Sequence, residues 1–314
     1  MKFIRQQEMS VCNALQIYYI CRKVNTRPGT AGEKTAMIPF LKQIASAYYD
    51  RGDIENTCFI FPNRRSEVFF VKYLSDLVAG KNAGGEDPVP LKVPDTCTIN
   101  DFIYRIYGIT PTARITLLLE LYTVYAGLFR KAETLDEFIF WGDIIIGDFN
   151  DVDKYMADAS QLFTNIADLK SIQDSFSYLS DVQRKAVEAF ISHFSDRNGR
   201  LTVNLESDDP KVKERFLQIW NILYPLYKAY RASLQEKNMA YEGMVYRDVA
   251  ERFSSGSPGE ILSQVFPYAR KFVFTGLNAL NECEKTVMRR MREMSLAEFC
   301  WDYSGSMIRD RYNK

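Results

Sequence analysis

The stretch TCFIFPNRRSEVFFVKYLSDLV, residues 57–78, decides the fold class. Its first part, TCFIFP at 57–62, is rich in β-branched and aromatic residues and predicts a short buried strand. A Pro-Asn turn signal follows, and after it apolar side chains recur at helical spacing. The segment from Met37 to Gly52 also has helical spacing. The sequence therefore predicts a helix–strand–helix unit, which is typical of a parallel sheet covered on both faces.

Further strands are predicted on both sides of a long helical region. One is expected near Lys92 to Cys97, followed by TINDFIYRIYG, in which Thr98 is suited to cap the amino end of a helix. Another is KFVFTGL at 271–277, and the segment from Phe299 offers a last one. Because the strand signal disappears between Thr110 and Asn238, we expect an α/β fold whose sheet is interrupted by an all-helical insertion.

These patterns divide the chain into four parts. We expect an N-terminal extension that need not be native, the first part of the α/β domain, the helical insertion, and a truncated return to the α/β domain, over residues 1–36, 37–109, 110–238 and 239–314.

Composition excludes several classes of protein. Forty basic side chains balance forty acidic ones, so any contact with nucleic acid must come from local patches. The single histidine, His193, argues against histidine-rich zinc sites and a Ser-His-Asp triad. The six cysteines form no CxxC pair, which indicates reduced thiols in a cytoplasmic protein. No apolar run approaches the roughly 20 residues that span a bilayer, so no membrane partner is expected.

Three segments resemble a known family: CFIFPNRRSEVFF at 58–70, the block at 141–170 that begins WGDIIIGDFNDVDKYM, and FTGLNALNECEK at 274–285. They are similar to the N-terminal, UvrD-like helicase portion of AddB-like PD-(D/E)XK nuclease family proteins of the Bacteroides type. The resemblance covers about residues 37–310. It implies a RecA-like (P-loop NTPase-like) parallel sheet, a role in double-strand break processing and recombinational repair, and a nuclease domain beyond this chain.

The resemblance also implies where DNA is bound. FPNRR at 61–65 stands where such proteins contact single-stranded DNA, and TINDF at 98–102 stands at their Thr-aromatic motif. The expected DNA-binding residues are Asn63, Arg64, Arg65, Thr98 and Asn100. The implied partners are DNA, either single-stranded or at duplex ends, and an AddA-like helicase-nuclease subunit.

The two arginines also have a physical argument of their own. Arg64 and Arg65 follow a buried strand, in a loop at the carboxyl end where open α/β sheets place ligands, and guanidinium groups there can grip phosphates. The alternative is that they form ordinary surface ion pairs.

The residues that hydrolyse ATP in such motors are replaced. A phosphate loop needs G-x-x-x-x-G-K-[ST], and the nearest fragment, Gly29 to Thr35, has a glutamate before Lys34, so Lys34 and Thr35 are only weak nucleotide-binding candidates. Thr275 and Gly276 stand where the resemblance would require the metal-binding Asp and the catalytic Glu. We therefore expect no catalytic residue and no cofactor in this chain.

Two alternatives remain open: an active ATPase lobe that uses Gly29 to Thr35, and a subunit-interaction module that touches no DNA. The latter would leave an apolar helical face exposed. An acidic cluster is interpreted as a solvated or capping face rather than a metal site, and consists of Asp143, Asp148, Asp151 and Asp153.

Overall fold

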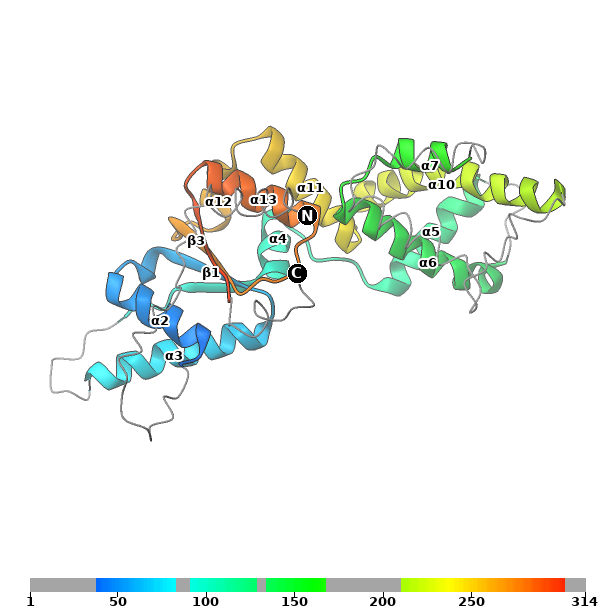
Figure 1. Cartoon of the computed structure of the whole chain (residues 1–314). Coiled ribbons are helices and arrows are strands. Elements are labelled where there is room, and N and C mark those ends of the chain that lie inside the picture. The colour runs from blue at the N-terminus through cyan, green and yellow to red at the C-terminus, as the bar shows by residue number, and fades with distance from the viewer. Residues whose placement is uncertain (1–37, 83–90, 129–133, 168–209, 303–314) are drawn as a thin grey trace, which may run out of the picture. The chain divides into compact units, whose positions relative to one another are not determined.

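The computed structural model describes residues 38–82, 91–128, 134–167 and 210–302 (Figure 1). The chain forms two compact units. The first comprises Met1–Ile106, Gly256–Leu280 and Met288–Lys314. The second comprises Tyr107–Ser255 and Asn281–Val287. The predicted extension at 1–36, with Lys34 and Thr35, lies outside the described residues, and so does His193.

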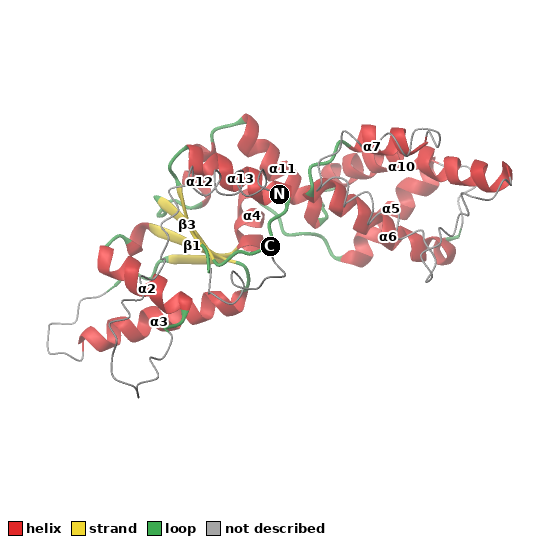
Figure 2. Ribbon diagram, viewed as in Figure 1, coloured by secondary structure: helices red, strands yellow, loops and turns green. Residues whose placement is uncertain are grey.

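The first unit contains a four-stranded, all-parallel sheet in the order β2-β1-β3-β4 (Figure 2). Its strands are β1 (Thr57–Phe61), β2 (Asp95–Thr98), β3 (Lys271–Thr275) and β4 (Ala297–Cys300). The α/β prediction and the parallel sheet are confirmed. β2 begins at Asp95 rather than near Lys92, because Pro94 has no N–H to donate to the ladder and the Lys92 N–H donates instead to Glu55, at 3.2 Å.

Helices cover both faces of this sheet (Figures 1 and 2). On one face lie α2 (Phe40–Arg51) and α3 (Arg64–Asn82), with the short 3-10 helix η1 (Ile54–Asn56) before β1. On the other face lie α4 (Ile99–Tyr107) and α12 (Pro258–Val265). After β3 comes α13 (Glu282–Glu293), whose residues are divided between the two units.

The central strands β1 and β3 are largely apolar because both of their faces are buried, whereas the edge strands β2 and β4 carry polar residues. All five residues of β1 are buried, and successive side chains point to opposite faces. Phe59 packs on Phe70 of α3, with ring centroids 4.5 Å apart. From β3, Phe272 and Phe274 pack on Phe102 of α4, at 5.8 Å each. The sheet is therefore the middle layer of a three-layer α/β unit.

The described part of the second unit is helical and contains no strand. Besides the start of α13, its helices are α5 (Arg114–Leu128), α6 (Leu135–Lys154), α7 (Ala159–Ala167), α10 (Pro210–Glu236) and α11 (Glu242–Ser255). The unit includes α11 because this helix packs directly on α6. At their crossing, a Cβ atom on Gly243 would lie 2.3 Å from the carbonyl oxygen of Asn150, so the contact requires glycine.

The acidic cluster on α6 is not the solvated face that the sequence suggested. Asp143 is exposed and pairs with Arg114 at 2.5 Å, but Asp148 and Asp153 are only 2% and 0% exposed. The prediction was wrong for these two carboxylates, since other helices of the unit cover them.

Asp153 is stabilised by partners from α10, from α11 and from Tyr241, which directly precedes α11. Its carboxylate accepts hydrogen bonds from Tyr227, at 2.5 Å, and from Tyr241. It pairs with Arg231 at 2.5 Å and with Arg247 at 3.3 Å. Burial first, and then the Asp153 carboxylate, raises the pKa of both tyrosines, so their hydroxyls stay protonated and donate. A buried carboxylate is tolerated only with such a set of partners.

Replacing this charge should destabilise the chain strongly. Asp153→Asn keeps the side-chain volume but removes the buried charge that half-buried Arg231 and Arg247 share, and leaves each arginine with one other carboxylate, Asp248 or Glu251. We expect a loss of about 1–3 kcal/mol in the free energy of unfolding, measured by urea denaturation. The matched control is Asp136→Asn, an exposed position on the same helix, which should shift stability by less than about 0.5 kcal/mol. Similar losses in the two variants would contradict a structural role for Asp153.

Candidate functional site at the carboxyl edge of the sheet

Two of the expected site residues cap helices where β1 and β2 end. The Asn63 Oδ1 atom accepts a hydrogen bond from the Ser66 N–H, at 3.0 Å, and so begins α3. Thr98 Oγ1 accepts from the Asp101 N–H at 3.1 Å, while the Thr98 N–H donates to Asp101 Oδ2 at 3.4 Å. The predicted N-cap at Thr98 is confirmed, and the cap is reciprocal.

Arg64 and Arg65 lie in the first turn of α3, not in a loop as the sequence suggested, because the Asn63 cap starts the helix immediately. Arg64 is held by two carboxylates, Glu67 at 3.1 Å and Asp101 at 3.5 Å. Arg65 is exposed and has no hydrogen-bond or ion-pair partner among the described residues. The surface ion pair that the sequence left open is therefore present at Arg64, and the Arg65 guanidinium is available to a ligand.

Glu67 connects this helix to the neighbouring strand. It is 9% exposed, accepts a hydrogen bond from Thr96 Oγ1 at 2.9 Å and pairs with Arg64. Phe61 of β1 lies opposite Thr98 of β2, so the segments that follow the two strands leave the sheet side by side. The structure therefore brings the predicted residues together on one edge, where Asn63, Arg64, Arg65 and Asn100 are exposed.

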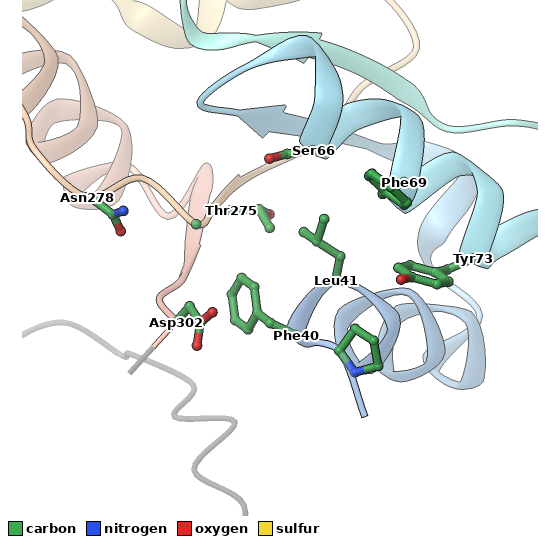
Figure 3. A pocket seen from close by; sticks show the side chains of 10 residues that line it. Phe40, Leu41, Ser66, Phe69, Tyr73, Thr275, Asn278 and Asp302 are labelled. Carbon is green, nitrogen blue, oxygen red and sulfur yellow. The ribbon is translucent and has the colours of Figure 1, made fainter. Parts of the chain in front are cut away.

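A pocket of about 410 Å³ opens at the same edge, between α2, α3 and the end of β3 (Figure 3). Its apolar wall comes from the starts of the two helices and includes Phe40, Leu41, Phe69 and Tyr73. The pocket lies where the chain order of the strands changes direction, since β1 leads to β2 on one side and β3 to β4 on the other. Open α/β sheets bind ligands at such a point.

The polar groups of the pocket come from the ends of β3 and β4 and from α3. They are Ser66, Thr275, Asn278 and Asp302 (Figure 3). Among the described residues that line the pocket there is no lysine or arginine, and Asp302 carries the only formal charge. The lining thus suits a neutral ring with hydrogen-bonding edges better than a phosphate.

The amino end of α2 adds to this apolar character. Pro39 occupies the cap position and makes no side-chain hydrogen bond to the helix. Gly276 has a φ of 68°, and a Cβ atom there would lie 3.4 Å from the Phe40 ring. Phe40 therefore packs over the glycine that follows β3.

Sequence reasoning missed this pocket. Residues 66–78 were interpreted only as a helix, and in the structure Phe70 and Leu74 provide its buried face. The available signal was a second aromatic pair at helical spacing, Phe69 and Tyr73, whose ring centroids are 6.2 Å apart. Phe69 is 44% exposed, although a large aromatic side chain usually contributes to a core.

No model of a known protein family matches the chain, and no curated protein matches it significantly. Over the described ranges, no helix has both the length and the apolarity needed to cross a bilayer. The same residues contain no cluster of three or more acidic, cysteine or histidine side chains suited to a metal ion. The four described cysteines, Cys58, Cys97, Cys283 and Cys300, are buried and free.

Removing the helix cap at Thr98 should show how much this cap stabilises the protein. Thr98→Ala deletes the acceptor for the Asp101 N–H, and we expect a loss of about 1 kcal/mol in the free energy of unfolding. Thr98→Ser should retain most of the stability because it keeps the hydroxyl. Thr116→Ala, at an exposed position of α5 with no capping bond, is the control. Equal stability of the Ala and Ser variants at position 98 would contradict the capping role.

Proposed function

We propose that this chain is the DNA-binding and scaffold part of an AddB-like helicase-nuclease that acts in double-strand break processing, and that it does not hydrolyse ATP. In this proposal the three-layer unit is a RecA-like domain, and the second unit is its helical insertion. The observation that carries the proposal is Arg65, which lies beside Asn63 at the carboxyl end of the central strand, is exposed, and has no partner within the described part of the chain.

The edge offers several hydrogen-bond donors suited to a DNA backbone. Arg65 supplies a guanidinium group that needs no prior ion pair to be broken. The cap uses only the Oδ1 atom of Asn63, so its amide N–H groups remain for a phosphate or sugar. Arg64 is three-quarters exposed but already paired with carboxylates, so its net contribution should be smaller.

The ATPase alternative is less well supported. It requires Gly29 to Thr35 as a phosphate loop and carboxylates at the end of β3 to hold magnesium. Thr275 and Gly276 occupy that strand end, and Thr275 is fully buried. The amino end of α2, which would face the phosphates, carries Pro39 and Phe40. These side chains neither bind a metal nor neutralise a phosphate.

One observation favours the alternative of a DNA-free interaction module. Ile115 and Leu119, one helical turn apart on α5, are 62% and 46% exposed. Such a stripe suits packing against another subunit, for which an AddA-like partner is the proposed candidate. If docking through this face were the sole function, the chain would self-associate or bind a partner through α5 and show no affinity for DNA.

The decisive experiment compares the two neighbouring arginines by fluorescence anisotropy with a tailed DNA duplex. Arg65→Ala should weaken binding more than Arg64→Ala, because Arg64 is paired with carboxylates and Arg65 has no such partner among the residues that the structure describes. The slope of log K against log salt should fall by about 0.7 for each lost single-strand phosphate contact. The control is Arg289→Ala, an exposed arginine of α13, which should bind as the unaltered chain does.

A second titration with a labelled ATP analogue tests the ATPase alternative. Nucleotide binding that is abolished by Lys34→Ala would support the ATPase alternative. Binding of DNA that is insensitive to both Arg64 and Arg65 would overturn the proposed site, and self-association without DNA binding would support the interaction module.

A further inference from the structure

We propose that the pocket between α2, α3 and β3 receives a nucleobase of the single strand whose backbone contacts Arg65. This inference rests on the proposed function and adds to it the part of the DNA that the pocket recognises. It assigns Phe69 and Tyr73 of α3 as stacking platforms for the base, while Arg65 contacts the DNA backbone.

The first argument for a base in this pocket is the spacing of three residues on α3. Arg65, Phe69 and Tyr73 are four residues apart, so they follow one another along the same face of the helix. Successive members are separated by about 6 Å along the axis, at roughly 1.5 Å per residue. That separation is comparable to the distance from a phosphate to the base of the same nucleotide. A strand held at Arg65 therefore places its base beside Phe69.

The second argument is the aromatic wall of the pocket. The rings of Phe69 and Tyr73 lie 6.2 Å apart and are inclined by 31°. Both line the pocket together with Phe40 (Figure 3). Phe69 exposes 44% of its surface, so a base can stack on it without displacing a core side chain. Stacking of this kind tolerates any base, since every base has a π face.

The third argument is the charge of the side chains that line the pocket. No cationic side chain lines it among the described residues, and Asp302 would repel a phosphate placed inside. The exposed Asn278 can both donate to and accept from the edge of a base. A volume of about 410 Å³ accommodates a base with its sugar, and lies within the range of small-ligand sites, roughly 300–1,000 Å³. The phosphate therefore stays at Arg65 and the base enters the pocket.

The test uses two oligonucleotides of equal length and equal phosphate number, one of thymidines and one of abasic sites. The intact chain should bind the thymidine strand at least about tenfold more tightly, the gain expected from one stacked base. Phe69→Leu and Tyr73→Leu keep apolar volume but remove the rings, and each should reduce this preference. Tyr268→Ala, which removes a 72% exposed tyrosine outside the pocket, should leave it unchanged.

A second readout places the base directly. A 2-aminopurine in the strand should lose fluorescence on binding to the intact chain and regain it with Phe69→Leu, while thermal melting verifies that the variant is folded. Equal affinity for the two oligonucleotides, with both weakened by Arg65→Ala, would overturn the base pocket but leave the phosphate contact. No binding of either strand would overturn both proposals, and binding of an apolar peptide in the pocket instead would reassign it.

Discussion

The pairing of β1 between β2 and β3 is the constraint on which the rest of the first unit depends. β1 is hydrogen-bonded to a parallel strand on each side, and all five of its residues are buried. Parallel pairing brings the carboxyl ends of all four strands to one edge. Asn63, Thr98, Thr275 and Asp302, which are distant in sequence, therefore lie around a common rim. The pocket and the proposed phosphate contact at Arg65 both depend on that arrangement.

Local sequence was sufficient for those features that local interactions determine. β1 and β3 each contain an uninterrupted apolar run, at 58–61 and 272–274, and Thr98 precedes a helix whose Asp101 completes the cap. The start of α3 was misplaced because the cap at Asn63 draws Arg64 and Arg65 into the helix. A difference of two residues at a helix end is small for secondary structure. It matters here, because position within the first turn decides which arginine is paired with a carboxylate.

Features that depend on distant partners could not be predicted. Nothing in the local sequence distinguishes buried Asp153 from exposed Asp143, since the partners that make its burial tolerable, Tyr227, Arg231 and Arg247, lie on other helices. The pocket presents the same difficulty, because it needs the end of β3 to approach the starts of α2 and α3. The spacing of Phe69 and Tyr73 is visible in the sequence. The structure is needed to show which face of the helix they occupy, because it shows that Phe70 packs on Phe59 of β1.

The end of β3 bears on both the ATPase alternative and the proposed base pocket. In a motor, carboxylates at this position hold magnesium, and the space before them must admit phosphates. Here Thr275 is buried and Phe40 packs over Gly276, so the same space is lined by aromatic rings, with Asn278 and Asp302 at its polar side. A buried carboxylate pair needs a bound cation, whereas an aromatic wall favours an uncharged ring. In the proposed function, the lack of carboxylates at Thr275 and Gly276 leaves this edge open to a neutral ring, and Arg65 would bind the backbone to which that ring is attached.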